Sequence, residues 1–79
     1  MKDRSTEWFK AVIFTVMSRR GSRSIYSTLG IASCCLPRIR GIRSFDEQHN
    51  FDRAIEELLR EGRLIKTKQD IHEYFSVAR

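Results

Sequence analysis

The 79-residue sequence has few of the residues that define disulfide-rich or disordered proteins. It contains one proline, and 41% of its residues are hydrophobic, which is typical of a globular chain. Its only cysteines are neighbours, Cys34 and Cys35, and two cysteines are too few for a secreted disulfide scaffold. We therefore expect partly buried free thiols, a cytoplasmic location and a single domain spanning residues 1–79.

The sequence also lacks the motifs of enzymes, metalloproteins and membrane proteins. Two histidines without a CxxC pair cannot supply a convincing four-ligand zinc site, so we expect no metal and no cofactor. Neither His49 nor His72 has a serine or cysteine at a spacing that suggests a nucleophile pair, and there is no glycine-rich phosphate loop. The apolar run 11–17 is too short to cross a bilayer. We expect neither an enzyme nor a membrane protein.

Acidic residues are missing from the middle of the chain. Between Trp8 and Phe45 there is none, whereas the same stretch holds seven basic residues: Lys10, Arg19, Arg20, Arg23, Arg38, Arg40 and Arg43. From Ser44 onward the balance reverses, with eight carboxylates against six basic residues. The formal net charge is +5. A basic block of this kind indicates a nucleic acid or another polyanion as partner, and a solubilising surface is the structural alternative.

The segment 50–78 has the clearest pattern in the chain. Five apolar residues recur at helical spacing and predict one buried helical face: Phe51, Ala54, Ile55, Leu58 and Leu59. Asn50 is a suitable N-cap for this helix, and Gly62 a suitable left-handed residue after it. The sequence Ser44-Phe45-Asp46-Glu47 also fits a capping box, so a start near Phe45 remains open.

After this helix the period changes to that of β-strands. We predict strands at 64–67 and 72–77 around a turn near Gln69-Asp70. A turn centred there would pair Leu64 with Phe75 and Lys66 with Glu73.

The helix that runs through glycine into a hairpin, RAIEELLREGRLIKT followed by EYFSVA, resembles the recognition helix and wing of winged helix-turn-helix domains. The resemblance covers about the last thirty residues. It implies an α+β, mainly α fold, with three or four helices and a C-terminal β-hairpin wing. A core helix followed by a hairpin without any ligand is the structural alternative.

Two further helical patterns precede this segment. Ser5 or Thr6 can cap a helix that ends by Arg19-Arg20, with Gly21 as its terminating residue. Its apolar stripe is Phe9, Val12, Ile13, Val16 and Met17, and Phe14 falls off that stripe.

The stretch 22–42 resembles a helix-turn-helix in its own right. In this interpretation a short helix stops at Gly30, Ile31 fills the turn, and a second helix starts from Ser33 as N-cap. The apolar residues Ile25, Leu29, Leu36 and Ile39 then face inward. Pro37 is compatible only within the first turn of the second helix. The alternative is an arginine-bearing loop over residues 33–44.

The winged-helix resemblance implies a duplex-DNA partner. It would place the N-terminal end of the last helix in the major groove, and the outer face of that helix would display four carboxylates, Asp52, Glu56, Glu57 and Glu61. The expected base-reading residues are Gln48, His49, Asn50 and Arg53. The expected phosphate contacts are Lys66 and Lys68 on the wing and Arg38, Arg40 and Arg43 beside it.

We therefore expect a small DNA-binding protein, homodimeric, that regulates transcription in a prokaryote or its virus or plasmid. Two alternatives remain open. The same fold can serve as a protein–protein interaction module, docking a basic partner on the acidic face of the last helix. The arginine-rich middle segment could instead bind structured RNA.

Overall fold

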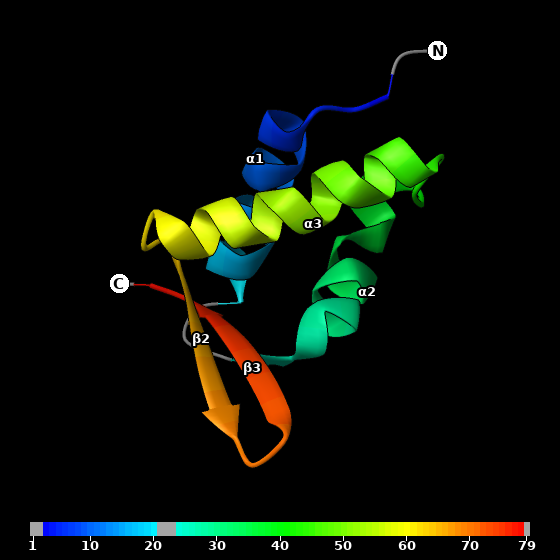
Figure 1. Cartoon of the computed structure of the whole chain (residues 1–79). Coiled ribbons are helices and arrows are strands. Elements are labelled where there is room, and N and C mark those ends of the chain that lie inside the picture. The colour runs from blue at the N-terminus through cyan, green and yellow to red at the C-terminus, as the bar shows by residue number, and fades with distance from the viewer. Residues whose placement is uncertain (1–2, 21–23, 79) are drawn as a thin grey trace.

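A computed structural model describes residues 3–20 and 24–78 of the chain (Figure 1). The elements follow one another as α1 (Thr6–Arg19), β1 (Ile25–Tyr26), α2 (Ser27–Ile39), α3 (Phe45–Arg60), β2 (Leu64–Gln69) and β3 (His72–Val77). The strands form an antiparallel sheet in the order β1-β3-β2. The expected coarse class, α+β and mainly helical, is confirmed.

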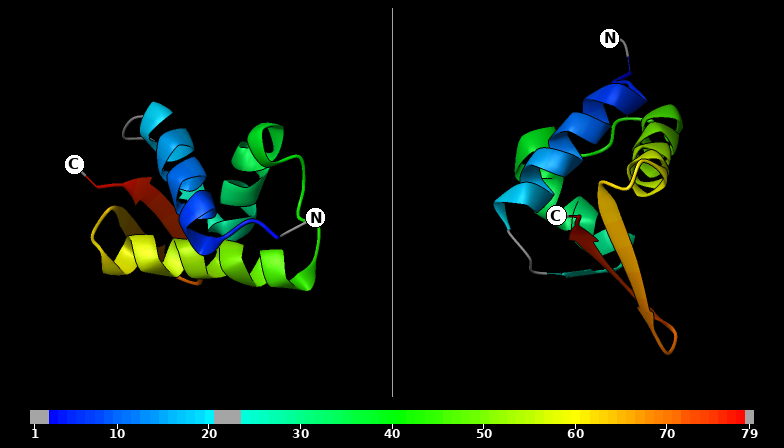
Figure 2. Two further views of the ribbon diagram at one scale, coloured as in Figure 1. Left: turned by 90° about the horizontal axis from the view of Figure 1, so that it is seen from above. Right: turned by 90° about the vertical axis from the view of Figure 1, so that its left-hand side faces the viewer.

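The three helices enclose the core, and the sheet closes one end of it. Figure 2, seen from above, shows α1 and α2 leading away from α3, so that their C-terminal ends lie on the side far from α3. The β2–β3 hairpin extends beyond the helices (Figure 1). The buried apolar core comprises Phe9, Ile13, Met17, Ile25, Ile31, Cys35, Ile39, Phe51, Ala54, Ile55, Leu58, Leu64 and Phe75.

Helix α1 begins as its sequence predicts. The Ser5 hydroxyl accepts a hydrogen bond of 3.1 Å from the Trp8 amide and caps the helix. Phe14, which falls off the apolar stripe, is half-buried, and the Arg63 guanidinium lies 5.4 Å from its ring centre. The predicted stop at Gly21 lies outside the described residues.

The prediction of a helix-turn-helix within residues 22–42 is wrong. Residues 27–39 form one continuous helix, so neither a turn at Ile31 nor a loop from Ser33 exists. Its buried face is Ile31, Cys35 and Ile39, whereas Leu29 and Leu36 are exposed and Ile25 belongs to β1. Gly30 lies inside the helix because β1 passes close by: a Cβ at this position would stand 2.6 Å from Cγ2 of Ile25. Pro37 lies in the last turn of this helix and not, as predicted, in the first turn of a second helix.

Helix α3 begins at the capping box rather than at Asn50. Ser44 is the N-cap, and its hydroxyl accepts from the Glu47 amide at 3.1 Å. The Glu47 carboxylate accepts from the Arg43 amide at 2.9 Å instead of reaching back to Ser44. Gly62 has φ +79° after the helix, as predicted.

A buried ion pair joins the N-terminal segment to both ends of the α2–α3 connection. The Arg4 guanidinium donates to Glu47 through Nε (2.8 Å) and Nη2 (2.7 Å), and the Arg4 amide donates to the same carboxylate at 2.7 Å. The Arg4 guanidinium also donates to the carbonyls of Ile39 and Gly41. The Glu47 side chain has no solvent exposure. The Arg4 guanidinium holds the pKa of the Glu47 carboxyl far below its usual range.

The hairpin has the predicted strands but a shifted register. Its two-residue turn is Asp70-Ile71, and Asp70 has φ +58°, a left-handed conformation that aspartate tolerates better than most residues. Leu64 pairs with Val77 and Lys66 with Phe75, so the predicted pairs are wrong. Moving the turn centre by one residue shifts each partner by two, which keeps every side chain on its predicted face.

Replacing Gly30 with alanine tests the close approach of α2 to β1. Alanine favours a helix by up to about 1 kcal/mol over glycine, but overpacking against Ile25 costs about 1–3 kcal/mol. We expect Gly30→Ala to lower the free energy of unfolding by about 1 kcal/mol in urea denaturation. Ser33→Ala, at an exposed position of the same helix, is the control and should not destabilise. A stabilised Gly30→Ala protein would contradict this packing.

Replacing Glu47 with glutamine tests the buried ion pair. The variant leaves the Arg4 charge without its partner, so we expect Tm to fall by on the order of 10 °C, against little change for the exposed Glu56→Gln. Because folding lowers the pKa of Glu47, the unfolded chain takes up protons first as the pH falls. The wild-type protein should therefore lose stability below about pH 4, the range where unperturbed carboxylates titrate, and Glu47→Gln should lose less. Parallel pH profiles would contradict this assignment.

Candidate nucleic-acid interface

The outer face of α3 carries three of the predicted base-reading residues. Gln48, His49 and Arg53 are all solvent-exposed on successive turns of the N-terminal half of the helix. The Gln48 amide donates to the Asp52 carboxylate at 3.2 Å. This arrangement offers amide, imidazole and guanidinium donors within two turns, which are groups that can meet base edges.

The Asn50 side chain makes hydrogen-bonding contacts within the protein and is not part of this outer face. Its Nδ2 donates to the Arg4 carbonyl at 2.8 Å, and its Oδ1 lies 3.4 Å from the Thr6 hydroxyl. The side chain is thus committed to holding the N-terminal segment against α3. It is neither an N-cap nor available to a ligand without breaking these contacts.

Two of the carboxylates expected on the outer face are neutralised by α1. The Lys10 ammonium donates to Glu61 and lies 3.3 Å from Glu57. Its hydrogen bond to Glu61 raises the pKa of Lys10 and lowers the pKa of Glu61. Together with the buried Glu47, this leaves Asp46, Asp52 and Glu56 as the exposed acidic residues of α3, against Arg53 and Arg60. The outer face is therefore mixed in charge rather than strongly acidic.

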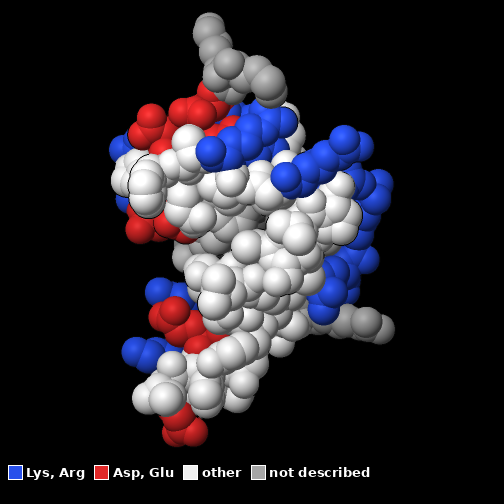
Figure 3. All heavy atoms as spheres, turned by 90° about the vertical axis from the view of Figure 1, so that its right-hand side faces the viewer, with Lys and Arg blue, Asp and Glu red and all other residues white. Residues whose placement is uncertain are grey.

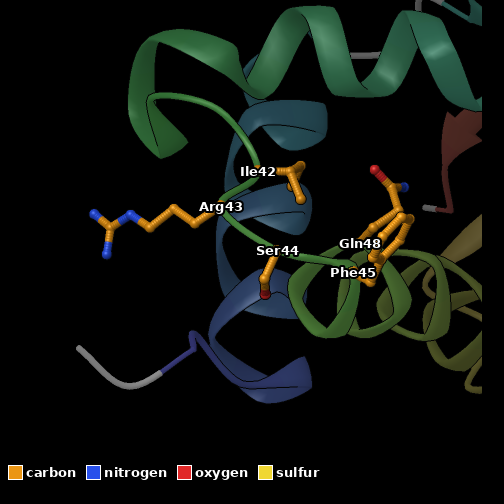
Figure 4. A pocket seen from close by; sticks show the side chains of 5 residues that line it. All are labelled: Ile42, Arg43, Ser44, Phe45 and Gln48. Atoms are coloured by element: carbon orange, nitrogen blue, oxygen red, sulfur yellow. The ribbon is translucent and has the colours of Figure 1, made fainter.

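The three arginines predicted to flank the helix separate in space. Arg40, in a left-handed conformation with φ +54°, and Arg43 are exposed in the connection from α2 to α3. In Figure 4 the Arg43 side chain points away from Phe45 and Gln48. Arg38 instead lines a hollow with Arg19 and Arg20, to which α3 contributes no residue.

Of the two hairpin lysines, Lys66 faces α3 across a groove, whereas Lys68 does not line it. The groove has a volume of about 410 Å³, and its charged lining residues are Asp52, Glu56, Lys66 and Glu73. Lys66 is paired with Glu73 at 3.6 Å, although the two are diagonal rather than opposite in the sheet. Lys68 is exposed and pairs in register with Glu73.

Apolar side chains are also exposed on α2 and at the start of α3. They are Leu29 (77%) and Leu36 (53%) on α2 and Phe45 (94%) on α3. Ile42, Phe45 and Gln48 project into one hollow of about 560 Å³ where α3 begins (Figure 4). On the side seen in Figure 3, Lys and Arg gather mainly along one edge and Asp and Glu mainly along the other, with uncharged surface between them.

Sequence patterns did not identify two sets of residues. Arg4 and Lys10 pair with carboxylates in α3 and just after it, but neither occupies a motif position, and these partners lie more than 40 residues away. Arg19 and Arg20 were visible as part of the acid-free basic block, although the block alone does not indicate that they approach Arg38.

Comparison of the chain with models of known protein families, with curated proteins and with solved structures gives no match. Among the described residues, no group of three or more His, Cys, Asp or Glu side chains is placed to hold a metal ion. No helix in residues 3–20 and 24–78 combines the length and apolarity needed to cross a membrane. The function must be inferred from the geometry of this chain.

The expectation of partly buried free thiols is confirmed, and the two cysteines differ sharply. Cys34 is half-buried, whereas Cys35 is fully buried, and burial raises the pKa of its thiol to about 11. We expect iodoacetamide at about pH 8 to modify Cys34 at least tenfold faster than Cys35 in the folded protein. Mass spectrometry of Cys34→Ser and Cys35→Ser proteins separates the two rates. Equal rates before denaturation would contradict the burial of Cys35.

Proposed function

We propose that this chain is a winged helix-turn-helix protein that binds duplex DNA through the outer face of α3, the α2–α3 connection and the hairpin. The observation that carries the proposal is the placement of Gln48, His49 and Arg53 on the exposed face of α3, a helix that leads into a hairpin. This element order agrees with the winged-helix resemblance of the sequence. The role we propose is transcriptional regulation in a prokaryote, or in a virus or plasmid of one.

The charge distribution supports this proposal. Lys10 and Arg4 engage Glu57, Glu61 and Glu47, so these carboxylates do not add to the repulsion of a phosphate backbone. Arg40 and Arg43 are exposed and form no ion pair within residues 3–20 and 24–78. They are suited to phosphate contacts, which position a protein without reading sequence.

The roles of the remaining residues follow from their placement. Gln48 and His49 are proposed to meet base edges, with Arg53 reaching a base or a phosphate. Lys68 is proposed to contact phosphate, while Lys66 would first have to leave Glu73. Asn50 and Arg38 are not part of the proposed surface, because Asn50 makes internal hydrogen bonds and Arg38 lines the arginine hollow away from α3.

Binding to random duplex DNA over a salt range of about 50 to 200 mM tests the proposal. We expect Arg43→Gln to weaken binding and to flatten the slope of log K against log salt by about 0.9, the value for one lost phosphate contact. Arg38→Gln is the matched comparison and should leave the slope unchanged. If only Arg38→Gln flattened the slope, the duplex would bind on the side away from α3, and the proposal would be wrong.

Sequence readout is measured in the same system. Selection from a random duplex pool should yield a preferred site for the wild-type protein, and Gln48→Ala or His49→Ala should relax that preference. Equal losses on every sequence would remove these residues from base readout.

A protein–protein interaction module is the second candidate, favoured by the exposed Leu29, Leu36 and Phe45. Phe45 lines the hollow at the start of α3, and exposed apolar side chains of this size are found at docking surfaces. A second copy of the chain bound there would give the homodimer expected for so small a core. Absence of duplex binding at about 50 mM salt would favour this candidate over the first.

A further inference from the structure

A second basic site lies between α1 and α2. It is a hollow of about 430 Å³ lined by the C-terminal half of each helix: Val16, Arg19, Arg20, Ser33, Cys34, Pro37 and Arg38. No residue of α3 or of the hairpin contributes to it. In Figure 2 the C-terminal ends of α1 and α2 point away from α3. The hollow shares no lining residue with the proposed DNA-binding surface, although Arg38 lies two residues before Arg40 of that surface.

The lining of the hollow is positively charged and contains no carboxylate. Arg19, Arg20 and Arg38 approach it from two helices, and none of them pairs with a carboxylate in the described part of the chain. Like charges that line the same hollow repel one another, so an anion bound among them would relieve that repulsion.

Arg20 adds a second, independent observation. Its Nε is buried and has no hydrogen-bond partner among the described residues. A buried donor without an acceptor is unfavourable and is rare in folded proteins. Arg19 and Arg38 lie in the last turns of their helices, where the helix dipole favours a cation, but that effect does not account for the unpaired nitrogen of Arg20.

We propose that this hollow binds a phosphate group carried by a larger molecule. Guanidinium groups match phosphate oxygens through paired hydrogen bonds, and the Ser33 hydroxyl supplies a further donor. Val16, Pro37 and Cys34 add apolar surface, which suits the organic part of a nucleotide better than a bare inorganic ion. The phosphate comes either from a free nucleotide, acting as an effector, or from a nucleic-acid backbone. In the second case Arg38→Gln would flatten the salt slope of duplex binding, and the proposed function at α3 would be wrong.

Cys34 provides a built-in reporter because it lines the hollow and is half-buried. We would measure its rate of modification by iodoacetamide in the Cys35→Ser protein with added pyrophosphate, ATP or a short duplex. Saturable protection by pyrophosphate or ATP supports a free phosphorylated ligand. Protection by the duplex alone supports a nucleic-acid backbone. No protection by any of the three overturns the proposal.

Substitutions test whether the protecting ligand binds in the hollow. Arg38→Gln and Arg19→Gln should each lower the affinity for that ligand about tenfold, the loss expected for one charge-assisted hydrogen bond. Arg60→Gln, an exposed arginine in the last turn of α3, is the matched control and should bind as the wild-type protein does. Equal weakening by all three variants means non-specific charge attraction and overturns the site. Arg43→Gln, in the α2–α3 connection, tests the proposed DNA-binding surface separately, so the two proposals can fail independently.

Discussion

The buried pair of Arg4 and Glu47 is the constraint on which the arrangement of the helices depends. One guanidinium binds the carboxylate that begins α3 and the carbonyls at the end of α2, so the connection between the two helices is fixed at both ends. Removing two charges from water is costly unless every donor and acceptor finds a partner. Here the carboxylate accepts from the Arg4 side chain and from the amides of Arg4 and Arg43. The cost of burying the pair is thereby offset, and the N-terminal segment, the end of α2 and the start of α3 are held together.

The same principle, long-range pairing of charges, shapes the surface. Lys10 on α1 engages Glu57 and Glu61, which neutralises part of the negative charge near the end of α3 and leaves the outer face of that helix mixed in charge. No carboxylate reaches Arg19, Arg20 or Arg38 within the described residues, so the hollow that they line remains basic. Arg40 and Arg43 are also exposed and unpaired within the described residues. The two surfaces that we propose to bind anions rest on these arginines.

Local patterns predicted some elements and misplaced others, for identifiable reasons. The helical stripes of α1 and α3 are long enough to fix their faces, and Ser5, Ser44 and Gly62 are local signals that act through neighbouring backbone groups. At Gly30 the local signal was misleading. This glycine was predicted to end a helix, but it lies within α2, where Ile25 of β1 leaves no room for a side chain. A glycine kept for close packing and one kept for a turn look the same in a sequence.

The sequence by itself determined which segments are helices or strands at the two ends of the chain and where basic residues concentrate, because these depend on spacing and composition. Most of the residues that the winged-helix resemblance implied for DNA binding are exposed and remain in the proposed surface. The tertiary structure alone decided that Asn50 is used internally, that α1 neutralises carboxylates of α3, and that Arg38 joins Arg19 and Arg20. Each of these outcomes requires residues 18 or more positions apart to meet, and no local pattern specifies which distant charges will do so.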